Sequence, residues 1–236
     1  MNLREFEEDK MTDNTTSNQF IDRAKKLDCA AISDALDRSG IVGQCYKIAA
    51  CDPKFRMVGH AYTVLYRLAN PDEEGNVGEY IDDVPPGNVI VIDNQGRDEM
   101  TTWGNILTEM AHQRKVAGTV IDGINRDVSL CRELNYPIYS SGYWMRTGKG
   151  RIQLVGLQVR VKIGGVSVNP GDLMCGDPDG VVVVPSHMQE QVLSYAEEIY
   201  ARENQVRKSI REGMRMDEAR RLQKYHFLQS QDYEKK

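Results

Sequence analysis

The sequence predicts an α/β domain whose sheet mixes parallel and antiparallel strands. Its most regular part is a strand–helix–strand unit, in which β-branched runs at 89–92 and 118–122 flank a helical pattern over 103–115. A crossover of this kind implies that the two strands are parallel. Later in the chain, short apolar runs separated by a Gly164-Gly165 turn favour antiparallel pairing. From Ser186 onward, an apolar stripe at helical spacing predicts one long helix.

The other elements are assigned by the same patterns. Apolar residues at helical spacing run from Asn18 to about Arg38, in a helix that Asp28 could interrupt. The remaining predicted elements are strands at 57–66 and 136–139 and a helix at about 127–134.

Composition along the chain predicts three parts. Residues 1–17 are polar and charged and are expected to form a mobile arm, residues 18–213 to form one domain, and residues 214–236 to form a charged C-terminal extension. Because so polar a helix has little to bury, the region beyond Gly213 is expected either to pack on a neighbouring subunit or to fray.

Composition also excludes several classes of function. The net charge of -5 gives no general attraction to phosphate backbones, so nucleic acid is not expected as a direct partner. No run approaches the roughly 18 apolar residues of a membrane span, and the first twenty residues lack the apolar core of a signal peptide. The five cysteines have no paired spacing. A cytoplasmic protein with reduced thiols is the expectation.

The first candidate site is the start of the helix near residue 103. Gly104 lets the chain approach a ligand closely, and the amides of Asn105, Ile106 and Leu107 at a helix start can bind an anion such as a carboxylate. The alternative is that Gly104 merely eases a turn and that Asn105 caps the helix.

The second candidate site follows the next strand, in the segment that holds Asp122, Arg126 and Asp127. Ligands gather beyond the carboxyl ends of parallel strands, so this loop should face the same crevice as the start of the helix. A carboxylate can hold a hard divalent cation, and a guanidinium can donate two hydrogen bonds to a carbonyl or carboxylate. The alternative is that Asp127 caps the following helix and that Arg126 is solvated.

Five segments of the chain resemble the RraA-like proteins. This family includes 4-hydroxy-4-methyl-2-oxoglutarate aldolase, 4-carboxy-4-hydroxy-2-oxoadipate aldolase, oxaloacetate decarboxylases and a regulator of ribonuclease activity. The resemblance runs from about Cys29 to about Gly213 and is carried by AISDALDRSG, PPGNVIVIDNQG, WGNILTEMA, GTVIDGINRD and VNPGDLMCGDPDGVVVVP.

The resemblance implies a swivelling-domain-like β/β/α fold and a homotrimer or hexamer with active sites between subunits. It implies that Asp127 holds Mg²⁺ or Mn²⁺, that Arg126 donates to the keto oxygen of the substrate, and that the amides after Gly104 bind the substrate carboxylate. A glutamate from the long C-terminal helix of the next subunit would complete the site. Glu203 is the nearest match by position, and Glu198 is the alternative.

The chain departs from the family pattern at Asn105. Family aldolases carry an aspartate twenty-one positions before the arginine, and that position is Asn105 here. The family aspartate is thought to position a metal-bound water that handles protons. An asparagine can hold a water by hydrogen bonding but cannot exchange a proton at neutral pH, so the acid–base role of this catalytic position is in doubt.

The resemblance predicts a divalent-metal-dependent carbon–carbon lyase that acts on pyruvyl-containing oxo-acids. Retro-aldol cleavage of a 4-hydroxy-2-oxo-acid and decarboxylation of oxaloacetate both leave a pyruvate enolate, so one site can do either. One alternative is a non-catalytic regulatory binding protein, and another is a related metal-dependent enzyme for a different oxo- or hydroxy-acid. The loops at 66–80 and 140–151 are expected to contact the distal part of the substrate.

Overall fold

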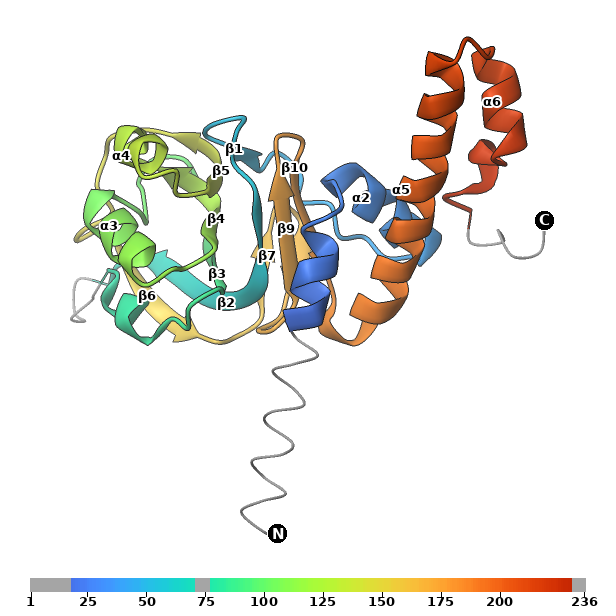
Figure 1. Cartoon of the computed structure of the whole chain (residues 1–236). Coiled ribbons are helices and arrows are strands. Elements are labelled where there is room, and N and C mark those ends of the chain that lie inside the picture. The colour runs from blue at the N-terminus through green and yellow to red at the C-terminus, as the bar shows by residue number, and fades with distance from the viewer. Residues whose placement is uncertain (1–17, 71–76, 231–236) are drawn as a thin grey trace, which may run out of the picture. The chain divides into compact units, whose positions relative to one another are not determined.

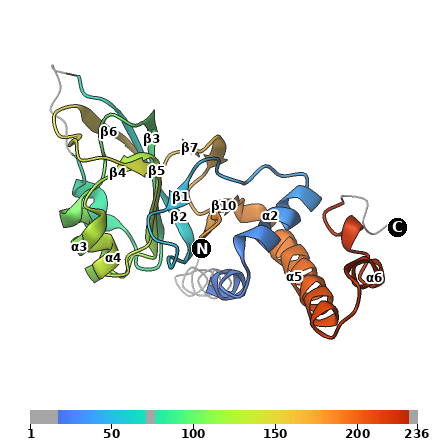
Figure 2. The same ribbon diagram turned by 90° about the horizontal axis from the view of Figure 1, so that it is seen from above.

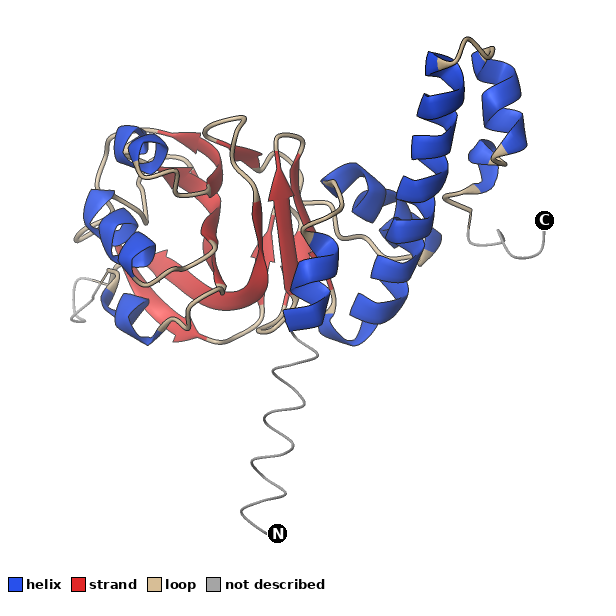
Figure 3. Cartoon of the chain, in the orientation of Figure 1, coloured by secondary structure: helices blue, strands red, loops and turns tan. Residues whose placement is uncertain are grey.

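The computed structural model describes residues 18–70 and 77–230. The predicted arm at 1–17 therefore lies outside the described residues, as do 71–76 of the first distal loop and 231–236. The chain forms two compact units, one of Val42–Ser186 and the other of Met1–Ile41 with His187–Lys236. Every described strand belongs to the first unit, and the second unit is helical (Figure 3). The predicted boundary of a single domain at 18–213 stays a prediction.

The first unit is built on an eight-stranded sheet in the order β1-β5-β4-β3-β2-β9-β10, with β6 also paired to β2 (Figure 1). Strands β2 to β5 pair in parallel, whereas β1, β6, β9 and β10 pair antiparallel to their neighbours. The mixed sheet is therefore confirmed. The strands are β1 Ala49–Ala50, β2 Met57–Leu68, β3 Val89–Arg97, β4 Gly118–Asn125, β5 Ile138–Tyr143, β6 Ile152–Leu157, β9 Leu173–Asp177 and β10 Gly180–Val184.

The central strands are covered on both faces. Helices α3 (Asn105–Gln113) and α4 (Val128–Glu133) lie on one face, and the hairpin of β7 (Val161–Ile163) and β8 (Val166–Val168) lies on the other (Figure 2). This explains why the sequences of β3 and β4 contain continuous apolar runs, since a strand that is buried on both faces does not alternate polar and apolar residues.

The predicted β3–α3–β4 crossover is confirmed, with one difference at its first strand. Strand β3 continues to Arg97 through a bulge, because its pairing with β4 resumes between Arg97 and Gly123 after a register shift at Asp93. The sequence pattern ends at 93 because the bulged residues are polar.

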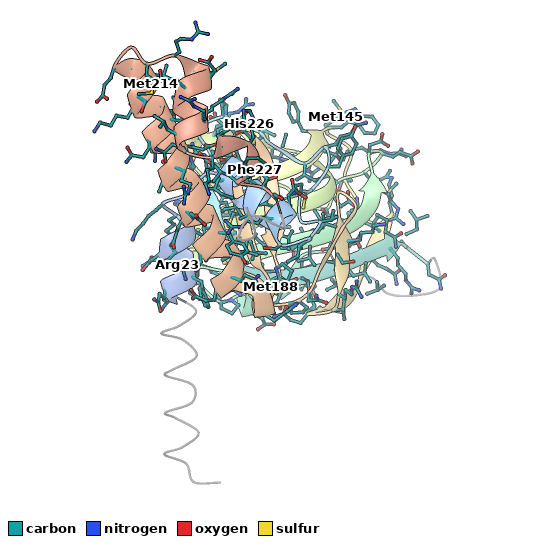
Figure 4. The ribbon with its side chains drawn as sticks, turned by 90° about the vertical axis from the view of Figure 1, so that its right-hand side faces the viewer. Arg23, Met145, Met188, Met214, His226 and Phe227 are labelled. Atoms are coloured by element: carbon teal, nitrogen blue, oxygen red, sulfur yellow. The ribbon has the colours of Figure 1, made fainter. Side chains whose placement is uncertain are left out.

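The second unit packs helices on one another. The predicted break at Asp28 is confirmed: a helix over 18–24 stops there, and the Asp28 Oδ1 atom accepts the Ala31 N–H at 2.8 Å to start α2 (Cys29–Arg38). Arg23 joins its helix to α5 (Gln189–Arg211) through ion pairs of 2.8 Å to Glu190 and to Glu197 (Figure 4). A 3-10 turn, η2 (Ser186–Met188), precedes α5.

The C-terminal extension is folded within its described residues, 214–230, so the expectation that it frays is wrong there, and packing on a neighbouring subunit stays a prediction. It forms α6 (Met216–Leu222) and the 3-10 turn η3 (Tyr225–Phe227). Ala219 and Leu228 are buried, and the Gln229 Nε2 atom donates to the Asp34 Oδ2 atom at 2.9 Å. A few well-placed apolar residues thus hold a segment whose average composition is too polar to predict folding. None of the helices in the described ranges has the length and hydropathy needed to cross a bilayer.

Candidate active site

A cavity of about 420 Å³ opens at the start of α3. It is lined by Val77, Glu79, residues 101–107, Arg126 and residues 147–150. The two segments that the sequence singled out, at the start of α3 and at the carboxyl end of β4, therefore meet at one pocket, as expected for a parallel strand–helix–strand unit.

The start of α3 is capped from outside the helix. Gly104 is the N-cap residue, has extended backbone angles and offers no side chain to cap the helix. Instead the Asp127 Oδ2 atom accepts the Asn105 N–H at 2.9 Å, and the Asn105 Oδ1 atom accepts the Ile106 N–H at 2.9 Å. Asn105 thus caps an amide of its own helix, which is the alternative first weighed for it. The predicted cradle of three amides exists, with two of its amides already bonded within the protein.

Glycine is required at position 104 by space and not by backbone angles. A Cβ atom there would lie 3.0 Å from the Asp127 Oδ2 atom and 3.2 Å from the Arg126 Nε atom. Any side chain would therefore push these two groups away from the helix start.

Asp127 occupies the position before α4 but does not cap it. Its backbone is left-handed, with φ 60° and ψ 37°, and its side chain makes no capping hydrogen bond to α4. The carboxylate turns to α3 instead, so the alternative that Asp127 caps its own helix is not what the structure shows. The Asp127 Oδ1 atom makes no hydrogen bond with any described residue, which leaves this oxygen available to a ligand.

Arg126 lies beside this carboxylate. Its Nε atom is 3.4 Å from the Asp127 Oδ2 atom, and each side chain is 36% exposed. The Nε atom is itself shielded from solvent and has no hydrogen-bond partner among the described residues. A shielded donor without a partner at the wall of a cavity suits a ligand oxygen.

Asp122 does not belong to the pocket, although the sequence placed it with Arg126 and Asp127. Its carboxylate faces the β7–β8 hairpin, near Gly164 and Lys162, and burial raises the pKa of Asp122 above its ordinary value. Asp122 lies within β4 on the side of the hairpin, whereas Arg126 and Asp127 follow the strand in the loop before α4.

Residues 147–150, within the second predicted distal loop, form a wall of the pocket. The Thr101 N–H donates to the Arg146 carbonyl at 3.0 Å, which brings residues 147–150 against the pocket. A Cβ atom at Gly148 would overlap the Thr101 carbonyl oxygen, so the glycines of the segment GKG were the available signal. Parts of both predicted distal loops, Val77 with Glu79 and residues 147–150, do line the cavity.

Glu203 and Glu198 lie on α5, in the helical unit. Glu203 pairs with Arg207 at 3.2 Å, one helical turn away. The Glu198 carboxylate forms two ion pairs: its Oε2 atom is 2.8 Å from the Arg38 Nη1 atom, and its Oε1 atom is 3.1 Å from the Arg202 Nη2 atom. The Arg38 side chain is only 4% exposed. Glu198 therefore neutralises a buried arginine within its own chain, and Glu203 stays the predicted contributor to a neighbouring site.

Replacement of Glu198 by alanine is expected to lower the free energy of unfolding by about 2 kcal/mol. This is less than the roughly 3–5 kcal/mol lost when a fully buried pair is broken, because Arg38 also lies over the Tyr195 ring at 4.0 Å. Glu203→Ala, the matched control, should cost only about 0.5 kcal/mol because its pair lies on the helix surface. Thermal or urea unfolding measures both variants, and an equal loss in the two would contradict the structural role of Glu198.

The pocket fits a divalent cation that is held mainly by non-protein ligands. No three His, Cys, Asp or Glu side chains cluster as a metal site within 18–70 and 77–230. Mg²⁺ commonly binds through one or two carboxylates, keeps several waters and takes further oxygens from its substrate. Asp127, with one oxygen held by the protein and the other available, suits this arrangement.

The comparisons with known proteins agree with this fold. The sequence model of the RraA-like family, described as Aldolase/RraA, matches residues 29–183, so the chain belongs to the RraA-like family. Among curated proteins, Protein DlpA of Legionella pneumophila is 34% identical over 214 residues. That match covers 90% of this chain but only 35% of DlpA, so the chain spans about a third of the length of that relative.

Other relatives match over most of their length. A protein of Halalkalibacterium halodurans, provisionally named a 4-hydroxy-4-methyl-2-oxoglutarate aldolase, is 32% identical over 83% of this chain and 90% of its own. The crystal structure of an uncharacterized protein from Pseudomonas syringae has a TM-score of 0.80 and 40% identity, covering 86% of this chain and 97% of that one. Streptomyces coelicolor RraAS2, described as an unusual member of the RNase ES inhibitor RraA family, has a TM-score of 0.72 and 26% identity, covering 79% and 94%.

Proposed function

We propose that this protein is a divalent-metal-dependent carbon–carbon lyase that acts on pyruvyl-containing oxo-acids. One observation carries the proposal: the Asp127 carboxylate contacts both Arg126 and the first amide of α3, beside a cavity that Arg126 and the start of α3 line. The name of the Halalkalibacterium relative supports the same class of reaction.

The protein's own groups provide binding and orientation. The start of α3 favours a carboxylate because the positive end of the helix dipole attracts negative charge, although the Asn105 and Ile106 N–H groups are already bonded within the protein. Arg126 is placed to donate to a keto oxygen and to stabilise the negative charge that develops there when the neighbouring carbon–carbon bond breaks. A bound Mg²⁺ or Mn²⁺ would polarise the same keto group as a Lewis acid.

Asn105 favours decarboxylation over retro-aldol cleavage. Loss of CO₂ from a 3-carboxy-2-oxo-acid needs stabilisation of negative charge but no base, whereas retro-aldol cleavage requires a base that removes the proton of the 4-hydroxyl group. Asn105 cannot act as that base. We therefore infer that oxaloacetate is the better substrate of the two.

The test is to incubate the protein with Mn²⁺ or Mg²⁺ and a panel of oxo-acids that includes oxaloacetate and a 4-hydroxy-2-oxo-acid, with enzymatic detection of pyruvate. Pyruvate release that a chelator removes and added metal restores is the expected result, with Asp127→Ala as the inactive control. Absence of release from every oxo-acid would refute the lyase and favour a regulatory binding protein, as the description of RraAS2 suggests.

We expect the protein to be a trimer or a hexamer, because the proposed site needs a glutamate from a neighbouring subunit. Exposed apolar residues near the pocket support this: Ile106 is 79% exposed, and Tyr143, Trp144 and Met145 are 60%, 44% and 71% exposed. Patches of this kind commonly mark protein interfaces. Light scattering should give three or six times the chain mass of 26.7 kDa. A monomeric mass at micromolar concentration would contradict both the assembly and the role of Glu203.

A further inference from the structure

Behind the pocket, buried polar side chains join α3 to the loop that carries Asp127. The Trp103 Nε1–H donates to the Thr108 Oγ1 atom at 2.9 Å, and the Thr108 hydroxyl donates to the Gly104 carbonyl at 3.2 Å. The Thr108 Oγ1 atom also lies 3.5 Å from the Cys131 Sγ atom, which is 3.9 Å from the Asp127 carbonyl. Trp103, Thr108 and Cys131 are each at most 2% exposed.

The bond from Thr108 to Gly104 acts on the peptide group that holds the Asp127 carboxylate. The Gly104 carbonyl and the Asn105 N–H belong to the same planar peptide group, so fixing the oxygen also fixes the direction of the N–H. The Gly104 carbonyl oxygen accepts hydrogen bonds from both the Thr108 N–H, at 3.1 Å, and the Thr108 hydroxyl. The N–H donates to the Asp127 Oδ2 atom at 2.9 Å. Hydrogen bonds accepted at the oxygen also polarise the peptide and strengthen its N–H as a donor.

We propose that Thr108 is a positioning residue for the metal site. Its hydroxyl, acting through the Gly104–Asn105 peptide, holds the Asp127 carboxylate with one oxygen on the helix start and the other directed to a divalent cation. The role assigned to Thr108 rests on the proposed function, in which Asp127 is the metal ligand.

Thr108→Val tests this role, because valine keeps the shape of threonine and lacks the hydroxyl. We expect the Kd for Mn²⁺, measured by calorimetry, to rise about 10-fold, at the lower end of the effect of residues that support a metal ligand. The Asn105 amide proton resonance should move upfield by roughly half the shift that Asp127→Ala produces, since its hydrogen bond weakens. Thr108→Ser, which keeps the hydroxyl, should restore both quantities to nearly the wild-type values.

Thr119→Val is the matched control. Thr119 is equally buried and its hydroxyl bonds only a distant partner, the Tyr136 hydroxyl at 2.7 Å. This variant should lose stability while keeping the wild-type Mn²⁺ affinity and Asn105 resonance. If Thr108→Val does not fold, Thr108→Ala removes the same hydroxyl without adding a methyl group and is measured in the same way.

The outcomes separate the role of Thr108 from the proposed function. A folded Thr108→Val or Thr108→Ala variant with wild-type Mn²⁺ affinity or an unmoved Asn105 resonance would overturn the positioning role, and so would equal effects of Thr119→Val. If the wild-type protein binds no Mn²⁺, the proposed function fails. The Asn105 resonance alone then decides whether Thr108 orients the peptide: a shift specific to the Thr108 variants supports the role, and no shift overturns it.

Discussion

Asp127→Ala is expected to abolish Mg²⁺ and Mn²⁺ binding while the chain remains folded. Asp127 is the proposed metal ligand and has an oxygen not engaged by any described residue, so its removal should weaken binding by more than the roughly 10²-fold loss that follows mutation of a residue supporting a metal ligand. Folding should lose about 1 kcal/mol for the missing cap on the Asn105 N–H and about 1–2 kcal/mol for a left-handed alanine.

Two further substitutions isolate the metal effect. In Asp127→Asn, the asparagine still offers an acceptor to the Asn105 N–H and can adopt a left-handed backbone. This variant should therefore keep the wild-type stability but no longer bind the cation. Asp122→Asn changes a carboxylate within β4, the strand that precedes Asp127, on the side that faces the β7–β8 hairpin, and should bind the cation as the wild type does. Calorimetry at pH 7 measures all three variants, and unchanged affinity in folded Asp127→Ala would rule out Asp127 as the ligand.

Asn105→Asp is expected to increase retro-aldol activity. If a missing proton acceptor limits cleavage of a 4-hydroxy-2-oxo-acid, restoring a carboxylate should raise kcat by the roughly 10²–10⁴-fold typical of a positioned acid–base group. Decarboxylation of oxaloacetate should gain much less, since breaking its bond needs no base. The change is nearly isosteric, and an aspartate in the first turn of a helix is favoured by the helix dipole.

The added carboxylate of Asn105→Asp should lower the stability of the protein in the absence of metal, and this loss can be measured. The Asn105 backbone N–H donates to the Asp127 Oδ2 atom at 2.9 Å, so a carboxylate on residue 105 would lie in the neighbourhood of the Asp127 carboxylate, and the two would repel in the absence of a cation. We expect Asn105→Asp to be less stable without metal and to regain stability when Mn²⁺ is added. Comparing kcat for both substrates at saturating metal settles the main point: an unchanged or lower kcat for both would show that Asn105 does not stand in for a lost catalytic acid.

Local patterns predicted the crossover and the residues that it brings together. Gly104, Arg126 and Asp127 could be identified because parallel strands and their helices place such residues at one edge of the sheet. The capping arrangement was not predictable, because the partner of the Asn105 N–H lies twenty-two positions away, in Asp127. The loop at 140–151 was expected near the substrate, but its backbone hydrogen bond to Thr101 was not predictable, since sequence periodicity does not encode such a contact.

The left-handed backbone at Asp127 also limits how this site can change by mutation. Only Gly, Asn and Asp adopt that conformation at little cost, and most other residues would lose about 1–2 kcal/mol there. Aspartate codons, GAT and GAC, become asparagine or glycine codons by a single base change. A gene of this kind can therefore lose the proposed metal ligand in one step and still encode a stable fold. A catalytic chain and a purely binding chain would then be separated by one nucleotide.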